Sequence, residues 1–190
     1  RANTHDQSPP QAAYIPTSGG LFRDCCVHDF DIIRFVTGRE IASVFARGAN
    51  KGAPFFAEAG DVDTAAAVLH LDDDTLVTLS ATRYNGAGHD VRMEVMGSDG
   101  TIGVGFDDSL AVRSAEVGVD YPAGPQHWSF MERFLPAYRA ELAAFTDVAK
   151  GNRPSPCTVA DALQAFRAAE ACELSRREDR VVKMDEVGSP

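Results

Sequence analysis

Hydrophobic and polar positions alternate with period two over much of the middle of the chain, as in strands with one buried face. In the segment 63–71, for example, Leu69 and Leu71 fall on one face, with polar or small residues between them. Turn-forming residues at 72–74 and 97–100 separate consecutive strands, and such short turns join antiparallel neighbours. The pattern therefore predicts an antiparallel meander of strands at 41–49, 63–71, 75–84, 90–97, 101–106 and 110–115.

Helical spacing of apolar residues predicts three longer helices, at 20–37, 131–150 and 159–177. Gly38 is expected to end the first helix. Pro136 either kinks the second helix or marks a fresh first turn. Thr158 and Asp161 resemble a capping box at the start of the third helix.

The two ends of the chain are expected to return to the sheet. The first residues resemble a strand, and 180–184 is predicted to be a short last strand. The proline-containing segment 8–20 is predicted to be an extended connector. The fold class is therefore α+β, a single domain over 1–190 with one large, mostly antiparallel open sheet and helices packed on one face. The other face is a natural interface for a homo-oligomer, a dimer or a tetramer.

Composition narrows the choice of partners. The sequence has 190 residues, is 44% hydrophobic and carries a net charge of −10. This acidity disfavours nucleic acid and anionic membranes as partners, and no apolar run approaches the roughly 20 residues of a spanning helix. The start at 1–7 has no features of a secretion signal. The cysteines form no C-x-x-C motif and are expected to be reduced, mostly buried thiols of a cytoplasmic protein: Cys25, Cys26, Cys157 and Cys172.

The candidate chemistry lies on the first predicted helix. On a regular helix, Asp24, His28 and Asp31 share one narrow stripe opposite an apolar arc. Side chains four residues apart are neighbours, so Asp24 can reach a nitrogen of His28. A carboxylate in this position orients the imidazole and raises its basicity, which suits proton transfer. The alternative is a solvated helix face with a local ion pair.

Asp29 is predicted to lie inside the apolar arc, where an unpaired carboxylate is costly. We therefore expect a dedicated donor for it, a backbone N–H or an arginine, and a structural role. Gly19 and Gly20 either supply unusual backbone angles at the start of the helix or let a ligand approach the backbone.

The loop 83–90 is the second candidate region, because polar loops at the end of a sheet often bind ligands. It contains Tyr84, Asn85 and His89; the alternative is a plain surface loop. No G-x-G-x-x-G loop between a strand and a helix and no P-loop is present in the sequence.

The first helix resembles the S-G-G-x-F-x-D-x-x-x-H-D-x-D motif of the glucose–fructose oxidoreductase / inositol 2-dehydrogenase (Gfo/Idh/MocA) family. The residues that match are Ser18, Gly19, Gly20, Phe22, Asp24, His28, Asp29 and Asp31. The stretch "DVRMEVMGSDGTI" (90–102) and the last two predicted helices are also similar to this family. The resemblance covers nearly the whole chain and implies the family's C-terminal α/β domain, with the N-terminal dinucleotide-binding domain absent from this chain.

The resemblance also implies an activity. His28 would accept the proton of a CH–OH group of a sugar or polyol, Asp24 would orient it, and a hydride would pass to NAD or NADP. The cofactor would be bound mainly by the absent domain, so this chain alone would be inactive. The proposed reaction would need no metal. Gly20, Tyr84, Asn85 and His89 would contact the substrate. His89 occupies a position near that of a substrate-contacting tyrosine in inositol dehydrogenases, so the identity of the substrate is left open.

Two other functions remain possible from the sequence. The domain could be a non-catalytic binding or assembly module of the same family. Less favoured is a metal-dependent hydrolase or isomerase, whose ligands would be Asp24, His28, Asp29 and Asp31.

Overall fold

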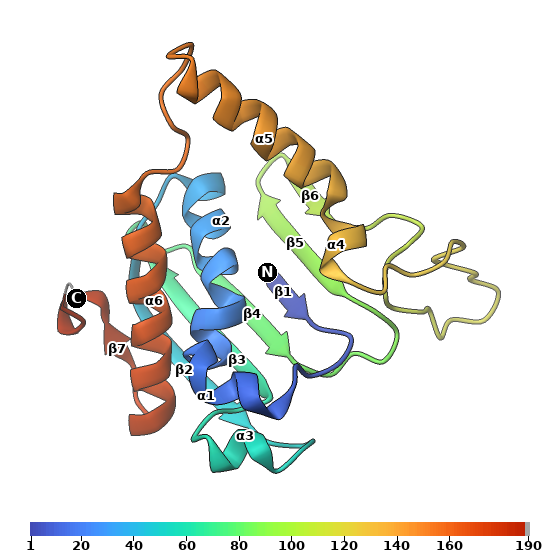
Figure 1. Cartoon of the computed structure of the whole chain (residues 1–190), viewed down its shortest axis with the longest axis horizontal. Helices are drawn as coiled ribbons and strands as arrows, with labels where there is room; N and C mark the ends of the chain where they lie inside the picture. The colour runs from blue at the N-terminus through green and yellow to red at the C-terminus, as the bar shows by residue number, and fades with distance from the viewer. Residues whose placement is uncertain (189–190) are drawn as a thin grey trace.

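A computed structural model describes residues 1–188 and contains one seven-stranded sheet (Figure 1). The strands are β1 (Ala2–His5), β2 (Ile41–Ala49), β3 (Thr64–Leu71), β4 (Leu76–Thr82), β5 (Asp90–Gly97), β6 (Gly100–Val104) and β7 (Val182–Lys183). Their order in the sheet is β6-β5-β1-β4-β3-β2-β7. Every neighbouring pair is antiparallel except β1 and β4, which are parallel.

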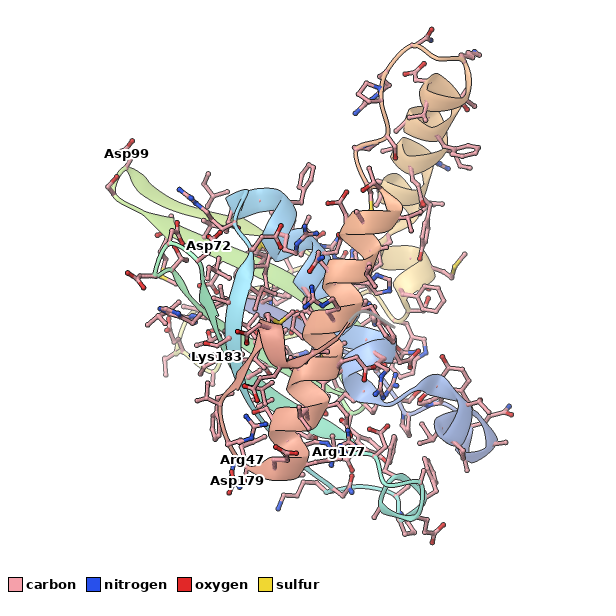
Figure 2. All side chains as sticks on the ribbon, turned by 90° about the vertical axis from the view of Figure 1, so that its left-hand side faces the viewer. Arg47, Asp72, Asp99, Arg177, Asp179 and Lys183 are labelled. Carbon is pink, nitrogen blue, oxygen red and sulfur yellow. The ribbon has the colours of Figure 1, made fainter. Side chains whose placement is uncertain are left out.

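The helices are gathered on one side of this sheet, and Figure 2 shows the two layers from the side. They are α1 (Ile15–Ser18), α2 (Val27–Thr37), α3 (Phe55–Glu58), α4 (Phe130–Arg133), α5 (Leu135–Ala149) and α6 (Val159–Glu178). Short 3₁₀ turns occur at Ala12–Tyr14 and Met184–Glu186, and a π-helical turn, Phe22–Cys26, precedes α2. The α+β class with an open, mostly antiparallel sheet is confirmed.

The predicted helix signals are found in the structure. Gly38 ends α2 with a left-handed φ of 65°. Helix α5 begins directly after Phe134, and Pro136 lies in its first turn, so the second predicted helix is two helices with a fresh start. The capping box of α6 is formed, because Asp161 and Thr158 each accept a hydrogen bond from the other's backbone N–H.

The structure differs from the predicted secondary structure and strand order at three places. First, β1 lies between β4 and β5, so these two consecutive strands are not paired: Ala2 is opposite Leu79 on one side and Met93 on the other. Second, 110–115 is not a strand in this structure. Its alternation comes from a loop that buries Leu110.

The third difference is the segment 8–20. It contains the turn Ala12–Tyr14 and helix α1, and is not extended throughout. The reason is Pro16, which occupies the first turn of α1, where a proline is compatible with helix because its missing N–H would have no partner.

The core lies between the sheet and helices α2 and α6. Phe22, Phe30 and Leu69 are among its fully buried side chains, and burying a side chain of this size contributes about 2–3 kcal/mol. The buried face of α6 consists of small residues, which allow a close approach to the sheet: Ala165, Ala168, Ala169, Ala171, Cys172 and Ser175. Three of the cysteines are buried, as expected, and Cys157 is exposed.

Two surfaces remain uncovered within residues 1–188. The second face of the sheet has no helix on it and exposes Val68 at 45%, next to Phe45 on the paired strand. Arg47 on the same strand forms an ion pair with Asp179 after α6 (Figure 2). Helix α5 has no buried residue and extends away from the rest of the molecule (Figure 1). No helix of the described residues has the length and apolar character to cross a membrane.

Candidate active site

The site begins at the two glycines before the π-helical turn. Gly19 and Gly20 have φ values of 85° and 93°, which favour glycine. A Cβ atom on Gly20 would lie 3.1 Å from Oδ1 of Asp61, so the space is also tight. The same Oδ1 accepts a hydrogen bond of 3.1 Å from the backbone N–H of Leu21 and so satisfies one free donor of the first turn. These contacts give Gly20 a clear backbone role.

Asp24 lies in the π-helical turn, and its two carboxylate oxygens have different donors. The hydroxyl of Tyr14 donates to Oδ1 at 2.5 Å, and the guanidinium of Arg83 donates to Oδ2. The hydrogen bond to Asp24 is the main reason why the pKa of Tyr14 is raised above its usual value. Asp24 is therefore held from two sides, by the segment before the helix and by the end of β4.

Arg83 connects Asp24 to two further groups. It is 3% exposed, and its second amino group donates to Oδ2 of Asp6 at 3.0 Å and to Sγ of Cys25 at 2.8 Å. Burial raises the pKa of the Cys25 thiol well above its usual value, so the sulfur is a neutral acceptor at pH 7. The ionic partners of Arg83 are thus the carboxylates of Asp6 and Asp24.

His28 follows on the first turn of α2 and is exposed. Each of the other four histidines has a carboxylate oxygen within 3.5 Å, but within residues 1–188 His28 has no such ion pair. The expected contact between Asp24 and His28 is therefore not formed in this structure. The π-helical turn, with its i→i+5 bonding, changes the stacking assumed for a regular helix, and Arg83 and Tyr14 occupy the oxygens of Asp24.

Asp29 is buried, as predicted, at 4% exposure. Its donor is neither a backbone N–H nor an arginine but the hydroxyl of Thr4 on β1, at 2.8 Å. Burial raises the pKa of Asp29 from 3.8 to about 7, although the hydrogen bond from Thr4 acts in the opposite direction. The carboxyl group of Asp29 links α2 to β1, and this link supports the structural role predicted for Asp29.

The loop after β4 uses its polar side chains within the protein. Tyr84 accepts a hydrogen bond of 2.9 Å from the backbone N–H of Ala53 and is 38% exposed. The side-chain amide of Asn85 donates to the carbonyl of Ala111 at 3.1 Å. Both residues brace neighbouring loops, and Tyr84 still presents part of its ring to solvent.

His89 is the least accessible of the predicted substrate residues, at 5% exposure. The rings of Phe130 and Phe134 face it edge-on, and neither ring nitrogen has a hydrogen-bond partner within residues 1–188. Its Nδ1 lies 3.5 Å from Oδ1 of Asp6. Burial lowers the pKa of His89, which favours the neutral imidazole at pH 7. In this structure His89 is part of the support behind Arg83 and does not lie open to a ligand.

The residues proposed as metal ligands do not converge. Among residues 1–188, no group of three or more His, Cys, Asp or Glu side chains could hold a metal ion. Asp29 is directed to Thr4, and Asp24 to Arg83. Asp31 lines a hollow beside the loop before α6, together with Arg153 and Cys157. The geometry does not support the hydrolase or isomerase alternative.

Sequence reasoning missed three members of the site: Asp6, Tyr14 and Arg83. Each lies in a different segment from Asp24, and only the fold brings them together. The available signal was Arg83 itself, a charged residue directly after an alternating strand, which had no assigned partner.

The comparisons with known proteins agree with this architecture. The model of the oxidoreductase family's C-terminal alpha/beta domain (GFO_IDH_MocA_C) matches residues 3–184. Fold and motif thus define a C-terminal domain of the oxidoreductase type. The chain belongs to the Gfo/Idh/MocA family, and the resemblance found in the sequence is confirmed.

Several of the individual relatives are inositol dehydrogenases. The myo-inositol dehydrogenase Hyg17 of Streptomyces leeuwenhoekii is 41% identical over 92% of this chain and 53% of its own length. The crystal structure of a myo-inositol dehydrogenase from Corynebacterium glutamicum has a TM-score of 0.83 and 33% identity, over 96% of this chain and 54% of that one. The scyllo-inositol dehydrogenase of Lactobacillus casei, with NAD(H) and scyllo-inositol bound, has a TM-score of 0.79 and 30% identity, over 97% and 56%. The chain spans about half the length of the relatives it matches.

Proposed function

We propose that this chain is the substrate-binding domain of an NAD- or NADP-dependent oxidoreductase that acts on a CH–OH group of an inositol or a similar polyol or sugar. The observation that carries the proposal is the exposed imidazole of His28, one helical turn after a fixed carboxylate, in a chain 41% identical to a myo-inositol dehydrogenase. His28 has no carboxylate partner within residues 1–188, so its ring is available to a substrate hydroxyl.

In the proposed reaction, His28 accepts the hydroxyl proton of the substrate. Asp24 is held between Tyr14 and Arg83, and the negative charge of its carboxylate favours the imidazolium that forms. Gly20, Tyr84 and Asn85 are the candidate substrate contacts near this turn, whereas His89 acts indirectly through Asp6. The nicotinamide, when bound, takes up the hydride from the substrate carbon.

The residues of this chain do not fit the phosphates of a dinucleotide. The two Gly-x-Gly stretches lie at 86–88, in a loop, and at 103–105, at the end of β6. Neither opens a helix within residues 1–188, so no N-terminal phosphate cradle is formed there. We therefore propose that a dinucleotide-binding domain holds the cofactor, and that the 190-residue chain alone does not reduce NAD or NADP.

The test is polyol oxidation by the natural polypeptide that contains this chain. Reduction of NAD or NADP is followed by absorbance with myo-inositol, scyllo-inositol and a set of sugars. We expect His28→Ala to lower kcat by about 10²–10⁴-fold, the usual contribution of a general base. His70→Ala is the matched control, because His70 pairs with Asp74 at the other end of the sheet and should leave the rate unchanged. Undiminished oxidation by His28→Ala would favour the non-catalytic module instead.

We also propose that the uncovered sheet face forms the interface of a homo-oligomer. This is supported by the absence of any helix on this face within residues 1–188 and by the exposed Val68 on β3. A charge at the centre of an apolar interface is strongly unfavourable. We expect Val68→Asp to shift the assembly to a monomer in light scattering after size exclusion, while Val117→Asp, a change at a fully exposed loop position, leaves its mass unchanged.

A further inference from the structure

Arg83 is the side chain that brings the site together, although it does not belong to the motif of the first helix. Its backbone N–H donates to the carbonyl of Asp63 at 2.8 Å, which fixes the start of the side chain at the end of β4. Its guanidinium then reaches Asp24 with one amino group and Asp6 with the other. Three segments that are distant in sequence thus meet at the guanidinium of Arg83.

The position of Asp6 is fixed as firmly as that of Arg83. The backbone N–H of Asp6 donates to Thr82 at 2.9 Å, and its carbonyl accepts from Asn85 at 2.7 Å. Because the forked guanidinium can bind two carboxylates in set directions, the direction of Asp24 follows from the sheet itself. A lysine at position 83 would keep the charge but would lose this geometry.

The charges also point to more than a structural role. The side chains of Asp6 and Asp24 are 22% and 19% exposed, and they share one guanidinium. Without this cation, two partly buried carboxylates would face each other and repel. Tyr14 adds a neutral donor to the other oxygen of Asp24.

We infer that Arg83 is a positioning residue for the proposed proton transfer: it holds the Asp24 carboxylate directed away from the imidazole, so that Asp24 acts on His28 through its charge and not through a hydrogen bond. This inference rests on the proposed role of His28. Tyr14 assists by fixing the second oxygen. The substrate hydroxyl then meets an imidazole whose ring nitrogens are not occupied by Asp24.

The first test compares Arg83→Lys and Arg83→Met in the natural polypeptide that contains this chain, over a range of pH. We expect Arg83→Met to lower kcat about 10- to 100-fold, because Asp24 is misplaced, with little change in KM. The acidic limb of its kcat/KM profile should move to higher pH, because the charge of the Asp24 carboxylate near His28 is no longer compensated by a cation. Arg83→Lys should keep the limb but still lose about tenfold in kcat.

The control is Arg47→Met, the same chemical change at the exposed ion pair between Arg47 of β2 and Asp179. It should leave kcat and the pH profile unchanged. If folded Arg83→Lys keeps kcat within about twofold of the parent, the fork geometry is unimportant and the inference is wrong. If Arg83→Met does not fold, Arg83→Lys alone decides.

A second readout needs no cofactor and no turnover. The ¹³Cζ signals of the tyrosines are titrated by NMR in the 190-residue chain. We expect the pKa of Tyr14, raised mainly by its hydrogen bond to Asp24, to fall in Asp24→Asn and to change in Arg83→Met, because Asp24 is then misplaced. An unchanged Tyr14 titration in both variants would contradict the inference. Full activity of His28→Ala, by contrast, would overturn the proposed function while this titration could still establish the coupling of Arg83 and Asp24.

Discussion

Asp24 and Asp29 lie five residues apart on the same helical segment, yet their surroundings are opposite. Asp24 is bound by the guanidinium of Arg83, at the end of β4, and by the phenol of Tyr14. Asp29 is enclosed in the core with one neutral hydroxyl, that of Thr4. The comparison shows that the surroundings of a carboxyl group are decided by the groups the fold brings to it, because the partners of both residues come from other segments of the chain.

This difference has opposite consequences for stability. The pKa of Asp29 is raised by burial from 3.8 to about 7, so the folded protein holds a proton that the unfolded chain has already lost between these values. Stability supplied by this protonation is present below pH 4 and is lost as the pH rises toward 7. Asp24 has the cation of Arg83 as its partner, so its contribution to stability is an ion pair and not a bound proton.

The largest effect on stability is expected from removing the shared cation. Arg83→Met should destabilise the fold by about 2–4 kcal/mol at pH 8, because two partly buried carboxylates lose their partner. Urea unfolding measures this change. Arg47→Met, at an exposed pair, should change stability by no more than about 1 kcal/mol. Equal effects of the two substitutions would mean that Arg83 contributes no more than a surface arginine.

The second prediction concerns Asp29 itself. Between pH 5 and pH 8 the stability of the parent should fall by about 1–3 kcal/mol more than that of Asp29→Asn, since a shift of one pKa unit corresponds to about 1.4 kcal/mol. The asparagine can still accept the hydrogen bond of Thr4. Asp72→Asn, at an exposed turn (Figure 2), should keep the slope of the parent. Identical slopes for the parent and Asp29→Asn would show that Asp29 does not titrate in this range.

Thr4→Val removes the one donor of Asp29 while keeping the shape of the side chain. We expect a loss of about 1 kcal/mol near neutral pH, the usual value for a single hydrogen bond. The midpoint of the pH dependence should move upward, because this hydrogen bond lowers the pKa of Asp29. A downward shift in urea titrations at several pH values would contradict this arrangement.

The smallest effect is expected at Tyr14. Its ring is 43% exposed, so Tyr14→Phe should change the free energy of unfolding by about 0.5 kcal/mol or less. Thermal unfolding of the two proteins should therefore nearly coincide. A loss comparable to that of Arg83→Met would mean that the hydroxyl, and not the guanidinium, carries most of the restraint on Asp24.

Much of the fold follows from local pattern. The strands 41–49 and 90–97 were predicted with the bounds that the structure gives, because alternation and turns are local properties. The start of α6 followed from its capping residues. The place of β1 in the sheet could not be predicted, since pairing between the ends of distant segments leaves no periodic trace.

The site was predictable only as far as one helix extends. The spacing placed Asp24 and His28 on one stripe, the family resemblance gave them their proposed role, and the burial of Asp29 was predicted from its position in the apolar arc. Their partners Arg83, Asp6 and Thr4 come from other strands. The π-helical turn was also missed, because the angular positions assumed 3.6 residues per turn throughout.

The central place of β1 has a consequence for how the sheet is assembled. Ala2 of β1 lies between Leu79 of β4 and Met93 of β5, so β1 must wait for two strands that are synthesised much later. Closing such long loops is entropically costly and slow. Until β1 is inserted, β4 and β5 each present an unpaired edge, and the strand that must fill the gap between them is β1 itself. A synthetic peptide with the sequence of residues 1–7 is therefore the natural competitor for this slot during refolding.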